Sequence, residues 1–172
     1  MNKGILLVLS GYLMWGCFPL YWALLNHVNP SEVLIHRMLW AVPVLFFLVH
    51  FKSSWKNNFK DSISSKKELV FLFITAILIT INWGGYIYAV NLGRVVEASM
   101  GYFLSPVINM IGGYIFFQER ISKLKQLAVF LATVGALYYV FSGDSFPWLG
   151  FLVGFTFSAY GIARKAMASS AV

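Results

Sequence analysis

The chain has 172 residues, of which 59% are apolar, 18% aromatic and only 11% charged. Soluble domains carry about 25% charged residues, so this composition excludes a typical soluble enzyme domain, a disordered chain and a coiled coil. The mean hydropathy of +0.74 favours a protein embedded in lipid. Cys17 is the single cysteine, which excludes an intramolecular disulfide, and the three histidines lack metal-ligand spacing. We therefore expect no metal and no cofactor.

Six apolar stretches follow one another along the chain. The first is too long for the apolar region of a signal peptide and no cleavage site follows it, so we expect a retained helix. A helix needs about 20 apolar residues to cross the hydrocarbon core, and the second stretch reaches that length if Asn29 caps a helix that begins at Pro30. The sequence thus predicts an all-α, polytopic membrane helix bundle of six transmembrane helices, at 4–25, 30–51, 69–92, 97–118, 124–142 and 147–165.

Basic residues fall almost entirely on one side of the predicted bundle. Eleven of the thirteen Lys and Arg residues are at Lys3, at 52–67, at 119–125 and at 164–165. Arg37 and Arg94 fall on the other side. Because positive residues mark the cytoplasmic side, we expect a cytoplasmic (inner) membrane protein with its N-terminus inside. The lipid bilayer is then its surroundings, and nucleic-acid binding is not needed to explain the net charge of +7.

An aromatic–glycine pair occurs in the first predicted helix as Trp15-Gly16 and in the sixth as Tyr160-Gly161. A unit of five helices must invert when it repeats, as in many secondary transporters. We therefore predict a first repeat at 1–143 and the start of a second at 144–172, in a chain that is the N-terminal part of a longer protein. Four small residues of the sixth helix would then lack a proper partner in this chain, namely Gly150, Gly154, Ser158 and Gly161.

A family resemblance rests on motifs spread over nearly the whole chain. They are Trp15-Gly16-x-Phe18-Pro19-Leu20-Tyr21-Trp22, His36-Arg37-x-Leu39-Trp40, Asn82-Trp83, Ala89-Val90-Asn91-x-Gly93, Glu97-Ala98-Ser99-x-Gly101-Tyr102-Phe103 with Pro106, Glu119-Arg120, Pro147-Trp148, and Tyr160-Gly161 with Arg164-Lys165. With them the chain resembles the RarD-type permeases (the chloramphenicol-sensitive protein group) of the EamA branch of the drug/metabolite transporter superfamily. The resemblance implies a two-repeat, ten-helix permease for a small-molecule substrate, of which this chain matches the first repeat plus one helix.

Arg37 lies about 10 Å along its predicted helix, a depth at which an arginine usually faces a bundle interior or a watery cavity. Two interpretations are open: it contacts a substrate or anion, or it extends to the outer head groups. Its neighbour His36 either serves in proton coupling or pairs with Glu32 one turn away.

Asn82, in the middle of the third predicted helix, is followed by Trp83 and, one turn on, by Tyr86. A mid-membrane amide either bonds a neighbouring helix or, with aromatic side chains, forms a pocket for an amphipathic organic substrate. Pro106 removes an N–H and frees the Tyr102 carbonyl. The result is a static kink, a hinge or a substrate-binding carbonyl, and the sequence leaves these alternatives open.

Glu97 begins the fourth predicted helix. It either stabilises that helix N-terminus or pairs with Arg37 or Arg94. The candidate substrate-binding residues are therefore Arg37, His36, Trp15, Asn82, Trp83, Tyr86, Glu97, Tyr102 and Pro106.

Two rival functions accompany a permease that works by alternating access. One is a non-transporting membrane protein with an interaction or assembly role, the remnant of a permease, although two such chains could assemble as a homodimer into a pore. The other is an intramembrane enzyme, which the sequence does not favour, because it has no P-loop, no His-Glu-x-x-His and no serine-hydrolase signature.

Overall fold

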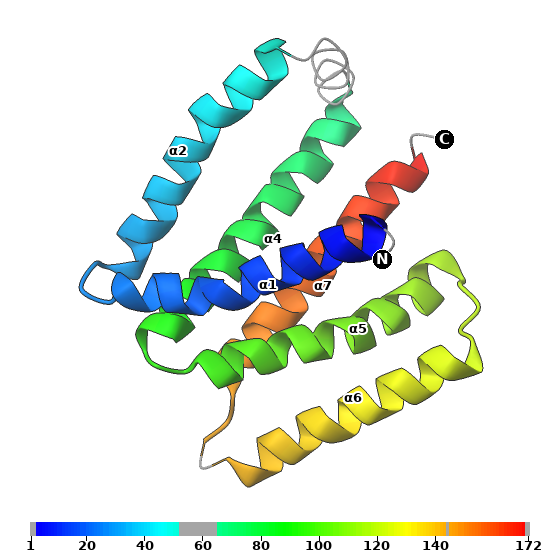
Figure 1. The fold of residues 1–172 in the computed structure, drawn as a ribbon. Helices are drawn as coiled ribbons and strands as arrows, with labels where there is room; N and C mark the ends of the chain where they lie inside the picture. The colour runs from blue at the N-terminus through cyan, green and yellow to red at the C-terminus, as the bar shows by residue number, and fades with distance from the viewer. Residues whose placement is uncertain (1–2, 52–64, 144, 171–172) are drawn as a thin grey trace.

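A computed structural model describes residues 3–51, 65–143 and 145–170, with side chains described through Met167. Helices make up most of these ranges, and no strand occurs within them, which confirms the all-α fold class (Figure 1). The helices are α1 (Lys3–Leu24), α2 (Pro30–Phe51), α4 (Lys66–Asn91), α5 (Val95–Phe117), α6 (Lys123–Ser142) and α7 (Trp148–Ser170).

Five of these helices, α1, α2, α4, α5 and α6, are long and apolar enough to cross a membrane. The sixth predicted span is present as the helix α7, which is long enough but less apolar. Its composition explains the difference, because α7 carries several Gly, Ser and Thr residues in its interior and Arg164-Lys165 near its end. These small and polar residues occupy a helix that is mostly enclosed by others, as described below.

Side-chain caps lie at the starts of α2, α4 and α6, and two of them bear on the predicted helix boundaries. The Asn29 Oδ1 accepts a hydrogen bond from the backbone N–H of Ser31 at 3.0 Å, and α2 begins at Pro30 as predicted. By contrast, α4 begins at Lys66, before the predicted residue 69. The Ser65 Oγ accepts from the backbone N–H of Glu68 at 3.1 Å, which is the Ser-x-x-Glu pattern of a helix N-terminus.

The core of the bundle is formed by α4, α5 and α7. The most extensive contacts are those of α7 with α5 and with α4, whereas α6 packs on α5, and α1 and α2 contact α4 (Figure 1). Ala89, Ala98 and Leu149, one from each core helix, are buried together with Tyr86 packed against them. In contrast, α1 has no buried residue, and large apolar side chains are exposed along α1, α2 and α6.

Glycines allow α5 and α7 to run side by side at backbone contact. A Cβ atom on Gly101 would lie 2.2 Å from the carbonyl oxygen of Gly150, and one on Gly154 would lie 2.7 Å from the carbonyl oxygen of Gly101. The Ser158 Oγ also donates to the carbonyl oxygen of Ser105 at 3.3 Å. We call this parallel contact the α5–α7 seam. Small residues on both helices are what let transmembrane helices approach so closely.

The α5–α7 seam corrects one expectation from the sequence. The small residues of the sixth helix were expected to lack a partner in this chain, and that expectation is wrong. Gly150, Gly154 and Ser158 are buried, and a Cβ on Gly161 would lie 3.6 Å from the Asn109 Oδ1 of α5. The physical reason is that α5 presents a matching small residue, Gly101, to the same stripe.

Candidate functional site

Arg37 of α2 lies against indole rings from two other helices. Its Cζ is 3.4 Å from the ring centroid of Trp83 on α4 and 5.6 Å from that of Trp22 on α1. Its side chain is half-buried. A guanidinium over an aromatic face is attracted by the ring quadrupole, more strongly where water is displaced. Arg37 is therefore held against the bundle by α1 and α4, while its contact with a substrate stays a prediction.

Asn82 joins the three core helices through its amide. The side chain is fully buried. Its Nδ2 donates to the carbonyl oxygen of Val153 at 2.8 Å and to the Thr156 Oγ1 at 3.2 Å, both on α7. Its Oδ1 accepts from the Tyr102 hydroxyl of α5 at 3.3 Å. Both amide hydrogens thus have acceptors, so Asn82 bonds neighbouring helices and also fixes the position of the Tyr102 hydroxyl.

Tyr102 connects this amide to a group of aromatic rings. Its ring centroid is 5.8 Å from that of Tyr86 and 5.4 Å from that of Phe157, which it meets edge to face. Tyr102 also lies within electrostatic range of the Arg37 guanidinium. Five of the nine predicted residues therefore gather at the junction of α2, α4 and α5. We call them the arginine–aromatic cluster: Arg37, Asn82, Trp83, Tyr86 and Tyr102.

Three predicted residues lie apart from the arginine–aromatic cluster. Trp15 on α1 is 58% exposed, and its ring packs edge to face on Tyr12 with a centroid distance of 6.3 Å. His36 and Pro106 are also exposed, and α5 continues as a helix through Pro106. Within the described part of the chain, no contact joins these three side chains to that of Arg37, and their roles in substrate binding stay predictions.

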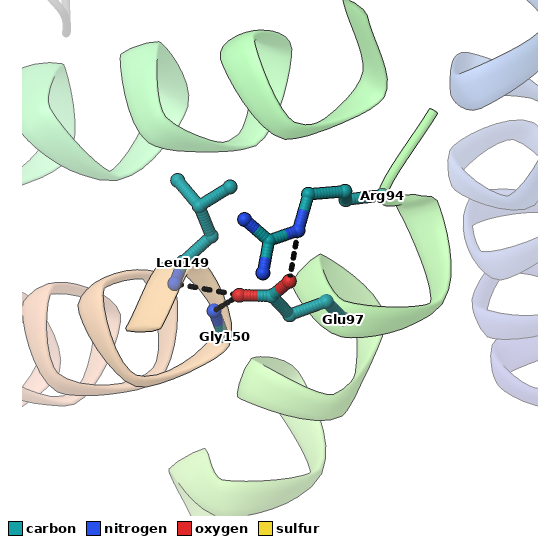
Figure 2. Close-up of polar contacts among 4 residues, drawn as sticks. All are labelled: Arg94, Glu97, Leu149 and Gly150. Atoms are coloured by element: carbon teal, nitrogen blue, oxygen red, sulfur yellow. Dashed lines mark hydrogen bonds and ion pairs between the residues drawn. The ribbon is translucent and has the colours of Figure 1, made fainter. Parts of the chain in front are cut away.

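Glu97 forms a second polar centre, at the start of α7 (Figure 2). Its side chain is only 4% exposed. Its Oε2 lies 2.6 Å from the Arg94 Nε, and its Oε1 accepts from the backbone N–H groups of Leu149 and Gly150 at 2.8 and 3.4 Å. Of the two partners predicted for Glu97, the structure thus shows Arg94 and not Arg37. Glu97 lies in the first turn of its own helix as predicted, but its carboxylate binds the free N–H groups of α7.

Several residues that complete these centres were not among the candidate substrate-binding residues. They are Trp22, Leu149, Val153, Thr156 and Phe157. One signal was available: α7 has no acidic residue in its own first turn, so a carboxylate from elsewhere could satisfy its N–H groups. A hydroxyl at Thr156 inside an apolar helix was a second signal, because buried hydroxyls need partners.

The opposite end of the α5–α7 pair carries an ion pair between Glu119 and Lys165. The hydrogen bond and the charge of Lys165 hold the pKa of the Glu119 carboxyl below its ordinary value. The Lys165 Nζ also lies 4.6 Å from the ring centroid of Phe117. These side chains border a shallow pocket of about 250 Å³ between the two helices. The α5–α7 pair is thus held by polar contacts at both ends.

The described residues contain no group of three His, Cys, Asp or Glu side chains that could hold a metal ion. The arginine–aromatic cluster instead combines one cation, several aromatic faces and one amide whose N–H and C=O groups are hydrogen-bonded. Such a set suits the binding of an organic molecule, because aromatic walls with a few fixed polar groups are typical of small-molecule sites.

Comparison with known proteins gives matches along nearly the whole chain. The model of the EamA-like transporter family matches residues 2–141. The chain is 36% identical over 166 residues to the uncharacterized transporter YojE of Bacillus subtilis, an alignment that covers 95% of this chain and 56% of YojE. It is 36% identical over 170 residues to protein RarD of Escherichia coli, covering 99% of this chain and 57% of that protein.

A more distant relative is the chloramphenicol-sensitive protein RarD of Pseudomonas aeruginosa. It is 28% identical over 174 residues, covering 99% of this chain and 58% of that protein. The chain therefore spans a little more than half the length of the curated relatives that it matches. No solved structure matches it.

Proposed function

This chain belongs to the EamA-like transporter family, and from that membership we propose that the protein is a secondary permease for small metabolites or drug-like compounds. The observation that carries the proposal is the arginine–aromatic cluster. It sets a half-buried cation, Arg37, against the ring of Trp83 and within electrostatic range of Tyr102 in the membrane-spanning helices. A charged side chain in that position is costly, so it usually marks a pathway for a solute.

The packing supports alternating access as the mechanism. α5 and α7 meet backbone to backbone at Gly101 and Gly154, and close-packed contacts of this kind resist sliding. α2 meets α4 through side chains instead: a Cβ on Gly84 would contact only the Leu34 Cδ2, at 3.1 Å. We therefore propose that α4, α5 and α7 move as one unit and that the solute passes beside α2.

The proposed surroundings are the lipid bilayer of the cytoplasmic membrane, with the N-terminus inside. The exposed apolar side chains of α1, α2 and α6 support a lipid contact, and the one-sided distribution of Lys and Arg supports the orientation. We also propose that the protein binds a small-molecule substrate, the solute that it carries across this membrane.

A metabolite screen tests the proposed function. Cells with and without the protein are compared for uptake and export of small molecules, and each hit is measured as flux into proteoliposomes. Tyr102→Phe removes one hydroxyl and its bond to Asn82, and we expect the flux to fall about threefold or more. The matched control is Tyr138→Phe, a residue that is 75% exposed on α6, which should keep wild-type flux.

Two results would count against a permease. One is a screen in which no solute differs between the two kinds of cell. The other is a solute whose flux into proteoliposomes is the same with and without the protein. Either result would favour the rival interaction or assembly role.

A further inference from the structure

We infer that the open edge of Arg37 binds the carboxylate of an organic anion, whose apolar part packs against the rings of Trp83 and Tyr102. The inference rests on the proposed function in one respect: it takes the arginine–aromatic cluster to be the solute site. It adds the chemical class of the solute, which neither the family nor its named members supply.

The Arg37 guanidinium contacts two aromatic rings. The Trp83 ring centroid lies 3.4 Å from Cζ, and the Trp22 ring is 5.6 Å away. The faces of these rings attract the guanidinium cation. They do not supply an acceptor atom for the N–H groups that lie in the plane of the guanidinium. A guanidinium carries five N–H donors in its plane. Among the residues that the structure describes, none accepts a hydrogen bond from Arg37 or forms an ion pair with it.

The acidic side chains of the described ranges are placed elsewhere. Glu97 is bound to Arg94 and to the α7 N-terminus. Glu119 pairs with Lys165. Glu32 and Glu68 lie in the first turns of α2 and α4. The positive charge of Arg37 is thus uncompensated within these ranges, although the side chain is half-buried. A half-buried charge is stabilised when an opposite charge and matching hydrogen bonds are supplied.

A carboxylate matches this edge better than other groups. Its two coplanar oxygens can take two parallel N–H bonds from a guanidinium, and such charge-assisted pairs are roughly twice as strong as neutral ones. The neighbouring rings then define the rest of the ligand. Asn82 fixes the hydroxyl of Tyr102, so that ring has a set orientation, with Tyr86 at a centroid distance of 5.8 Å. The site therefore selects an anion with an aromatic or apolar body.

Matched acid and amide probes test the inference directly on the wild-type protein in lipid nanodiscs. The pairs are phenylacetate with phenylacetamide, indole-3-acetate with its amide, and hexanoate with hexanamide, and binding is measured by titration calorimetry. Each amide keeps the shape of its acid and loses the charge. We expect at least one acid to bind about tenfold or more tightly than its amide. If no acid binds more tightly than its amide, the inference is wrong.

Two variants test whether the preference for the acid over its amide arises at Arg37. Arg37→Lys keeps the charge and loses the planar fork, so the preference for the acid should fall severalfold without vanishing. The control is Arg120→Lys, which makes the same change at an exposed arginine between α5 and α6 and should keep the preference. An acid preference that is undiminished in Arg37→Lys would overturn the assignment to Arg37. The wild-type comparison of acid with amide remains decisive if Arg37→Lys does not insert.

Binding and flux separate this inference from the proposed function. Selective binding of an acid through Arg37 with no flux into proteoliposomes would support the carboxylate site and refute the permease. Flux of a neutral solute, with no acid preferred over its amide, would support the permease and refute the carboxylate site.

Discussion

Replacement of Gly101 by alanine tests whether the α5–α7 seam holds the core together. The added Cβ would lie 2.2 Å from the carbonyl oxygen of Gly150 and 3.0 Å from the backbone nitrogen of Gly154. Both neighbours are backbone atoms and cannot rotate away. Non-bonded carbon atoms approach to about 3.5–4.0 Å at their optimum, so the two helices must separate by about 1 Å.

The expected loss of unfolding free energy is estimated from the contacts and hydrogen bonds that this separation would disturb. Overpacking of a close contact costs about 1–3 kcal/mol. Two bonds across the seam would lengthen as well, from Leu149 N–H to Glu97 at 2.8 Å and from Ser158 to Ser105 at 3.3 Å, at about 0.6 kcal/mol each. Alanine regains about 1 kcal/mol of helix propensity over glycine. We therefore expect the free energy of unfolding to fall by about 1–3 kcal/mol.

The assay is unfolding in mixed micelles titrated with SDS, followed by tryptophan fluorescence and circular dichroism. The matched control is Gly135→Ala on α6, where an added Cβ would meet nothing within 4 Å; this variant should be at least as stable as the wild type. Equal unfolding free energies for Gly101→Ala and Gly135→Ala would refute the close contact and, with it, the rigid unit of α4, α5 and α7.

Two further predictions concern topology and pH. In a background whose native cysteine is replaced by serine, a cysteine at Ser145 should react with a membrane-impermeant maleimide in intact cells. One at Ser62, which lies outside the described residues, should react only after the cells are opened; labelling of Ser62 in intact cells would reverse the orientation. Because Lys165 holds the pKa of the Glu119 carboxyl below its ordinary value of 4.5, their pair stabilises the fold above that value and loses this contribution as pH falls through the lower folded-state pKa. The stability advantage of wild type over Glu119→Gln should therefore shrink in acid; an advantage that is constant with pH would contradict the pairing.

The helices were predictable because each depends on local sequence. Uncharged runs of sequence predict the membrane spans, and the cap at Asn29 predicts the first residue of α2 correctly. The start of α4 was misplaced because charged residues were taken as the limit of the helix. The Ser65-x-x-Glu68 cap was present in the sequence and overrides that limit, since satisfied N–H groups allow a helix to begin among charged residues.

Partners across the bundle were less predictable than the helices themselves. The small residues of α7 were recognised, but a stripe of small residues specifies only that a helix can come close. It does not specify which helix. Gly101 could have been identified as the matching residue only if α5 and α7 were already known to be neighbours. The predicted topology makes these helices parallel, but their contact depends on the packing of α4, α5 and α7 together. For the same reason the sequence left Asn82 open between a bond to another helix and a place in a pocket. In the structure Asn82 donates a hydrogen bond to α7 and accepts one from the Tyr102 hydroxyl.

Glu97 shows why the two alternatives at a buried carboxylate need not compete. A carboxylate has two oxygens and about four acceptor sites, so a helix N-terminus and a cation can be satisfied together. The local signal, an acidic residue in the first turn of α5, pointed to its own helix, whereas the unmet N–H groups of α7 lie 52 and 53 positions further along the chain. Arg94 takes the remaining oxygen from three residues away. The carboxylate is thereby held at the end of α7 by Arg94 and by two backbone N–H groups. It forms no ion pair with Arg37, so the arginine–aromatic cluster keeps an uncompensated charge available for an anion from outside the described residues.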